Sequence, residues 1–141
     1  RHYHLSDSDR LSRFQYLKRL CRALQHVLIL ADSALTAREW GADGIYGAPR
    51  ALYPTRNDML TIATAHDLKE IGHANRAKAD AVMLSPVFAT NSHPDADFLG
   101  PNRFRNLARH AGMPVIALGG MDQQTADRLK GRRWAAIDGL S

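Results

Sequence analysis

Short apolar runs alternate along this chain with longer stretches in which apolar residues recur every three or four positions. The runs are typical of buried parallel strands, and they cover 27–30, 42–46, 59–63, 81–84, 115–118 and 134–137, with a weaker one at 2–5. The periodic stretches predict helices at 6–25, 33–39, 67–79, 102–111 and 123–130. This alternation predicts one α/β domain over residues 1–141, whose parallel sheet is either open or closed into a barrel.

Two helix-to-strand junctions share a motif. Residues 41–43 read Gly-Ala-Asp and residues 78–80 read Lys-Ala-Asp, at the same place in the predicted unit. The chain opens on Arg1 rather than Met, and 2–5 reads as the later part of a strand. We therefore expect a piece to precede it, and one further strand would raise the predicted count from seven to eight.

The composition narrows the class of partner. The formal net charge is +5, but Lys and Arg are spread along the predicted helices rather than clustered with aromatic residues, which argues against nucleic-acid binding. A basic balance suits a phosphorylated small molecule. One cysteine excludes an internal disulfide and suits a reducing cytoplasm. The longest apolar run is far below the ~18 residues of a membrane helix, and the sequence allows a homo-oligomer.

A glycine pair, Gly119 and Gly120, directly follows the predicted strand 115–118 and precedes a helix that Asp122 can cap. Exposed backbone amides beside a helix N-terminus form anion sites, and in barrels phosphate often binds in the last two strand-to-helix loops. The alternative is a tight turn that merely needs glycine. Spacing alone does not separate the two.

Other polar residues follow strands in the same way. Thr90, Ser92 and His93 form a run that could hold a phosphate oxygen or simply a hydrogen-bonded surface loop. Asp32 is a candidate Mg²⁺ ligand or a helix cap, and His66 a candidate acid or base, or a cap. No Cys-x-x-Cys or His-Glu-x-x-His motif is present, which argues against zinc.

Several motifs in order carry a resemblance to a known family. They are Thr-Ala-His at 64–66, Ala-Asp-Ala-Val-Met-Leu-Ser-Pro-Val-Phe-Ala-Thr at 79–90, Leu-Gly-Pro-Asn-Arg-Phe at 99–104, Pro-Val-Ile-Ala-Leu-Gly-Gly-Met at 114–121 and Trp-Ala-Ala-Ile at 134–137. The chain resembles the thiamine phosphate synthase and thiazole tautomerase family. The resemblance implies a compact (β/α)8 barrel whose first strand lies before Arg1.

The resemblance assigns roles by position. Arg1 and Thr64 match residues that bind a diphosphate, and Asp32 matches a ligand of Mg²⁺. Thr90 and Ser92 match residues that hold a thiazole phosphate. The phosphate-binding residues are expected to be Gly119 and Gly120, with Ile137 beside them.

Some positions depart from the family pattern. Tyr3 and His93 stand where the family has lysines, Ala31 stands for an asparagine, and Asp138 stands for a serine. A segment carrying a second metal-binding aspartate is absent from 47–50. These changes remove positive charge and metal ligation that a departing diphosphate needs.

Three functions follow from the resemblance. A synthase would couple hydroxymethylpyrimidine diphosphate to thiazole phosphate with Mg²⁺ and release diphosphate. A thiazole tautomerase would move a proton through His66 and would need no cofactor. A non-catalytic protein would only bind a thiazole or thiamine phosphate. We rank the synthase first.

Overall fold

The computed structural model describes residues 4–54, 56–90 and 97–137. Its helices are α1 (Asp7–Ala23), α2 (Ala34–Trp40), the 3-10 helix η1 (Pro49–Leu52), α3 (Leu68–Ala77), α4 (Gly100–Ala108) and α5 (Gln123–Asp127). Its strands are β1 (Ile29–Leu30), β2 (Gly44–Gly47), β3 (Leu60–Ala65), β4 (Ala81–Leu84), β5 (Val115–Ala117) and β6 (Arg133–Trp134).

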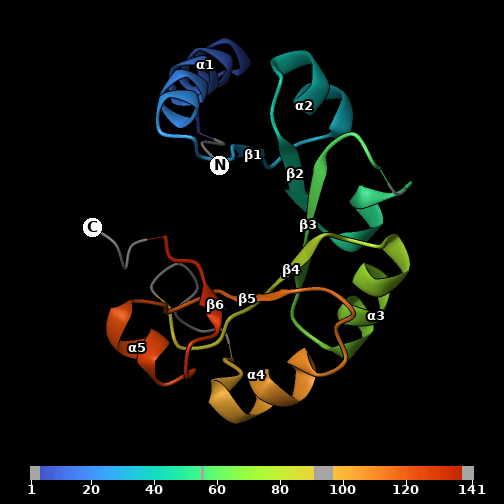
Figure 1. Cartoon of the computed structure of the whole chain (residues 1–141), viewed down its shortest axis with the longest axis vertical. Coiled ribbons are helices and arrows are strands. Elements are labelled where there is room, and N and C mark those ends of the chain that lie inside the picture. The colour runs from blue at the N-terminus through green and yellow to red at the C-terminus, as the bar shows by residue number, and fades with distance from the viewer. Residues whose placement is uncertain (1–3, 55, 91–96, 138–141) are drawn as a thin grey trace.

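The six strands form one parallel sheet in the order β1-β2-β3-β4-β5-β6, so each strand pairs with its neighbours in sequence. Figure 1 shows the chain as an open arc, with the strands on its inner side and α2 to α5 outside. Among the described strands, β1 and β6 each pair on one side only. The prediction of an α/β fold with a parallel sheet is confirmed, whereas closure into a barrel is not seen.

Alternation along β3 explains the two faces of the sheet. Thr61, Ala63 and Ala65 are buried, while Ile62 and Thr64 between them are half-buried. Because successive side chains of a strand point to opposite faces, the small buried residues face α3, which packs on β3. Ile62 lines a cavity on the inner face.

The repeated junction motif is a hydrogen-bonded clamp. Asp43 N donates to Leu28 O at 3.0 Å, and Leu28 N donates to Asp43 Oδ2 at 2.8 Å. In the second copy Asp80 N donates to Thr61 O at 2.9 Å, and Thr61 N donates to Asp80 Oδ2 at 2.8 Å. Each aspartate therefore ties a helix-to-strand junction to the preceding strand segment, as the shared motif indicated.

Three strand predictions were wrong in extent. His4 and Leu5 form a turn and a bend, so the described half of the expected 2–5 strand is absent, and His2 and Tyr3 lie outside the described residues. The predicted 27–30 strand is reduced to β1 (Ile29–Leu30), and the predicted 134–137 strand is replaced by β6 (Arg133–Trp134), which overlaps it at Trp134 alone. Both lie at an edge of the described sheet.

The first helix is less buried than its periodicity predicts. Phe14 is its one buried residue, whereas Leu20 and Leu24 are 42% and 63% exposed. Figure 1 places α1 at the open end of the arc, where β1 has no second neighbour in the described sheet. No helix among the described residues has the length and apolar character needed to cross a lipid bilayer.

Candidate functional site

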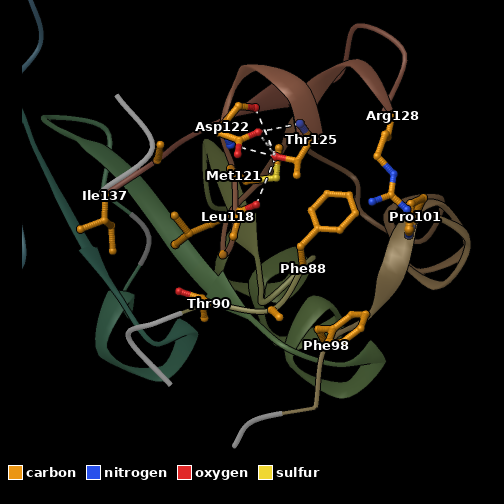
Figure 2. A pocket seen from close by; sticks show the side chains of 14 residues that line it. Phe88, Thr90, Phe98, Pro101, Leu118, Met121, Asp122, Thr125, Arg128 and Ile137 are labelled. Carbon is orange, nitrogen blue, oxygen red and sulfur yellow. Dashed lines mark hydrogen bonds between the residues drawn. The ribbon is translucent and has the colours of Figure 1, made fainter. Parts of the chain in front are cut away.

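The loops after β4, β5 and β6 meet at the carboxyl edge of the sheet. The register is regular there, with Leu84 opposite Ala117 and Ala117 opposite Trp134. The three loops and α5 surround a cavity of about 620 Å³ (Figure 2). Four predicted site residues line it, namely Thr90, Gly119, Gly120 and Ile137. These four predictions therefore converge on one cavity.

The glycine pair lets the β5 loop pack tightly against the β4 loop. Gly119 and Gly120 have φ of +91° and +60°, a region that favours glycine. A Cβ on Gly119 would lie 2.7 Å from Pro86 Cα, and one on Gly120 would collide with Ala89 O. Close packing thus explains why glycine is needed, which is the tight-turn alternative, and both glycines also line the cavity.

The N-terminus of α5 is occupied by the protein's own carboxylate. Thr125 N and Thr125 Oγ1 donate to Asp122 Oδ1 at 2.6 and 2.9 Å, and Asp122 N donates to Thr125 Oγ1 at 2.8 Å. Hydrogen bonds from the Thr125 amide and hydroxyl hold the pKa of Asp122 below its usual value. Asp122 is therefore the N-cap of α5, as predicted. Its carboxylate, rather than a bound anion, accepts the hydrogen bond from the Thr125 amide at the start of this helix.

A cation that the sequence analysis missed lies at the same cavity. Among the described residues that line it, Arg128 is the one basic side chain and Asp122 the one acidic side chain. Arg128 extends from the end of α5 past Pro101 (Figure 2), and its Cζ lies 4.8 Å from the centre of the Phe88 ring. Arg128 is the C-cap residue of α5. Because the sequence analysis looked for site residues directly after strands, this position was not predicted to belong to a site.

Asp32 is not the cap of α2, and its side chain is 26% exposed. The cap is Ser33, whose hydroxyl accepts from Thr36 N at 3.1 Å. Asp32 accepts from Arg10 Nη2 at 2.8 Å, from Ser33 N at 2.7 Å and from Thr36 Oγ1 at 3.1 Å. Partial burial alone would raise the pKa of Asp32, but these hydrogen bonds together outweigh it and lower the pKa below its usual value.

His66 follows β3 at the carboxyl edge, and the cap of α3 is Asp67 rather than His66. His66 N donates to Glu70 Oε2 at 2.7 Å, and the ring Nδ1 lies 2.8 Å from the same oxygen. If Nδ1 carries the proton, as a carboxylate neighbour favours, Nε2 is left for a substrate. The side chain of His66 is 58% exposed and does not line the cavity of Thr90 and the glycines.

The remaining predicted residues divide into two groups. Thr64 lies on β3 opposite Met83, on the inner face of the sheet, and does not line the 620 Å³ cavity. Arg1, Ser92 and His93 lie outside the described residues.

A family model described as thiamine monophosphate synthase matches residues 1–139. The chain belongs to this family. It is similar to the thiamine-phosphate synthase of Geobacillus kaustophilus, with 32% identity over 145 residues that cover 97% of this chain and 64% of the relative. The Synechococcus synthase is 32% identical over 129 residues, which cover 85% of this chain and 36% of the relative. The chain thus spans less than two thirds of the length of these relatives.

The fold agrees with that of a solved thiamine phosphate pyrophosphorylase. Thiamine phosphate pyrophosphorylase from Pyrococcus furiosus superposes with a TM-score of 0.77 at 22% identity, covering 94% of this chain and 67% of that chain. At this identity the likeness concerns the fold alone.

The described residues do not fit the Mg²⁺ site that the family resemblance implies. Magnesium needs several oxygen ligands in octahedral geometry. Asp32 has both carboxylate oxygens engaged, and no group of three or more His, Cys, Asp or Glu that could hold a metal is found in 4–54, 56–90 and 97–137. The segment after β2 is the 3-10 helix Pro49–Leu52, which carries no acidic residue.

Proposed function

We propose that this chain carries out thiamine-phosphate synthesis, coupling a hydroxymethylpyrimidine diphosphate to a thiazole phosphate. The single observation that carries the proposal is the convergence of Thr90, Gly119, Gly120 and Ile137 on one cavity in a chain of the thiamine monophosphate synthase family. The names of the similar proteins favour this reaction over the tautomerase and over a protein that only binds.

The coupling needs no oxidant or reductant. The carbon–oxygen bond between the pyrimidine methylene and the diphosphate breaks, and diphosphate leaves with the electron pair. The thiazole nitrogen then donates its lone pair to the methylene carbon and forms the new carbon–nitrogen bond. The protein has to bind both anionic groups and hold the reacting atoms together, since positioning and charge stabilisation supply most of such a rate enhancement.

Asp122 takes the N-terminus of α5, so in the cavity after β4, β5 and β6 the thiazole phosphate would be held by Thr90 and Arg128 instead. Thr90 brings a hydroxyl group, and Arg128 brings a positive charge that forms no ion pair with another described residue. Phe88 and Phe98 provide aromatic surface along the lining, against which a planar heterocycle can pack (Figure 2).

We also propose that the sheet belongs to a (β/α)8 barrel. The six strands follow the sequential parallel order of such a barrel, with helices on the outside. Two further strands between β6 and β1 would pair both edges and cover Leu20 of α1 and its C-cap residue Leu24, which are now exposed. A crystal structure in which the outer edges of β1 and β6 pair with no further strand would contradict this.

The other expectations stay predictions. They are a single domain over residues 1–141, a cytoplasmic location, small phosphorylated heterocycles as partners without nucleic acid or membrane, and a tautomerase role for His66 as the second candidate. The observation that favours the second candidate is the Glu70 carboxylate against Nδ1, which orients the ring.

The test is diphosphate release by the purified full chain in the presence of both substrates. We expect release only when both are present, and a Thr90→Val variant to raise KM for the thiazole phosphate about tenfold, as expected when a hydrogen bond to a charged group is lost. Ser8→Ala on α1 is the control and should leave KM unchanged. A folded chain that releases no diphosphate would disprove the proposed function.

A further inference from the structure

The guanidinium of Arg128 is held against the aromatic ring of Phe88. The Cζ atom of Arg128 lies 4.8 Å from the centre of that ring, within the range of a cation–π contact. Phe88 is 8% exposed, so it is packed into the protein. Its backbone is fixed as well, because Phe88 N donates to Gly119 O at 3.0 Å. Phe88 is therefore a fixed surface, and an arginine lying on it loses part of its rotamer freedom before any ligand binds.

The backbone that carries Arg128 is fixed from the neighbouring helix. Arg128 is the C-cap residue of α5, and carbonyl groups at a helix C-terminus lack a partner within the helix. Arg105 of α4 supplies a partner, since its Nη2 donates to Arg128 O at 2.8 Å. The same guanidinium donates from Nη1 to Asn102 Oδ1 at 3.2 Å. Arg105 therefore joins the end of α5 to α4, and it does so without lining the cavity.

These contacts form a closed circuit beside the cavity. The start of α4 is tied to the β4 loop, because Gly100 N donates to Val87 O at 2.9 Å. Further along α4, Arg105 holds the backbone of Arg128. The side chain of Arg128 then returns to Phe88, the residue after Val87 in the β4 loop. Arg128 is thus positioned through its backbone and through its side chain, by two elements that are themselves joined.

The charge of Arg128 is available for a ligand. Its guanidinium forms no ion pair with another described residue, and it is the one basic side chain among the described residues that line the cavity. A cation–π contact does not use the N–H donors at the edge of the guanidinium. These donors match the oxygens of a phosphate group, which arginine can bind through two parallel hydrogen bonds.

We propose that Phe88 and Arg105 are positioning residues for phosphate binding by Arg128. Phe88 holds the guanidinium, and Arg105 holds the backbone from which the side chain extends. The inference rests on the proposed function in one respect, since that function supplies a phosphorylated heterocycle. A side chain that is already fixed loses less conformational entropy when a phosphate group binds, which favours affinity. The two residues therefore raise the selectivity of the cavity for the phosphorylated heterocycle over the same heterocycle without phosphate.

The test is a titration of the full chain with inorganic phosphate, followed through the Arg128 Nε–Hε resonance in proton–nitrogen NMR spectra. Inorganic phosphate has no aromatic ring, so lost packing of a heterocycle on Phe88 cannot produce the effect. We expect the Kd to rise about two- to tenfold in Phe88→Leu and in Arg105→Gln, as expected when one side chain has to be immobilised on binding. Phe88→Tyr keeps the aromatic face and should keep the wild-type Kd.

The same spectra report the position of the side chain before phosphate is added. A proton close to the face of an aromatic ring is shielded, so the Arg128 Hε resonance should move in Phe88→Leu and stay in place in Phe88→Tyr. An unmoved resonance in Phe88→Leu would overturn the inference. So would phosphate binding that is absent in the wild type, that is unchanged in Phe88→Leu, or that falls as much in Phe88→Tyr as in Phe88→Leu.

Arg103→Gln is the matched control for Arg105→Gln. Arg103 is exposed on the same helix and does not line the cavity, so its replacement removes the same charge without releasing Arg128. If Phe88→Leu does not fold by circular dichroism, this pair decides: an Arg105→Gln protein that loses no more phosphate affinity than Arg103→Gln would overturn the inference.

The outcome separates the inference from the proposed function. If Phe88→Leu and Arg105→Gln weaken phosphate binding as expected, yet the chain fails to couple the two heterocycles, the proposed function falls and the inference stands. If the chain couples the heterocycles while both variants keep the wild-type Kd for phosphate, the inference falls alone.

Discussion

Gly120 offers a sharp test of how the β4 and β5 loops are held together. Alanine at this position must adopt φ of +60°, and its Cβ must displace Ala89 O and lie 2.8 Å from Phe88 Cβ. The left-handed backbone costs about 1 kcal/mol for a residue other than glycine, and forcing a methyl group into packed surroundings adds about 1–3 kcal/mol. Gly120→Ala should therefore lower the free energy of unfolding by about 2–4 kcal/mol.

Gly131 supplies the matched control. Its φ is +75°, and a Cβ there would meet nothing within 4 Å. Gly131→Ala should therefore cost only the backbone contribution of about 1 kcal/mol. The assay is urea unfolding followed by circular dichroism, with the m-value checked for each variant. At about 4 °C per kcal/mol, the thermal midpoints should fall by about 4 °C for Gly131→Ala and about 8–16 °C for Gly120→Ala. Equal losses in the two variants would refute the packing argument.

Three further predictions concern single side chains. Arg128→Gln should raise KM for the thiazole phosphate about tenfold or more with little change in KM for the pyrimidine diphosphate, because one charged hydrogen bond is lost; equal changes in both constants would contradict its placement. The folded-state pKa of Asp122 is depressed, so the carboxylate stabilises the fold above pH 3.8, the ordinary pKa, and this stabilisation is lost as the pH falls below that value. Between pH 5 and pH 2 the free energy of unfolding should therefore fall more steeply for the wild type than for Asp122→Asn. Parallel curves for the two proteins would contradict this stabilising role of Asp122. Glu70→Ala removes the bonds to His66 N and Nδ1 and should cost about 1 kcal/mol in urea unfolding, whereas Lys69→Ala should cost nothing measurable.

The sequence predicted the strand-to-helix rhythm because the physical signal is local. Ser6, Asp67 and Asp122 were expected near helix starts, and each caps a helix by accepting a backbone N–H three residues on. Strand lengths at the sheet edges were not predictable in this way. The apolar run 27–30 reads as a full strand, yet ladder pairing depends on neighbours that a local pattern does not reveal.

The candidate site was predicted in part for the same reason. Thr90 and the glycine pair were found because residues after parallel strands share one edge of a sheet. Arg10 and Arg128 were missed because both act from helices, and their relation to Asp32 and Phe88 joins residues 22 and 40 positions apart that no spacing rule connects. The carboxylate of Asp32 therefore looked like a metal ligand until its arginine partner was placed.

The paired clamps of Asp43 with Leu28 and of Asp80 with Thr61 have a consequence for how this architecture tolerates change. Both lie where helices lead into strands, at the rim opposite the loops that surround the cavities. These two clamps fasten the amino rim with contacts in which no residue lining the cavity of about 620 Å³ takes part. Substitutions of lining side chains at the carboxyl rim, other than the closely packed Gly119 and Gly120, should therefore alter which molecule is accepted while the clamps keep the scaffold intact, so a library confined to those side chains is the direct way to give this chain a new specificity.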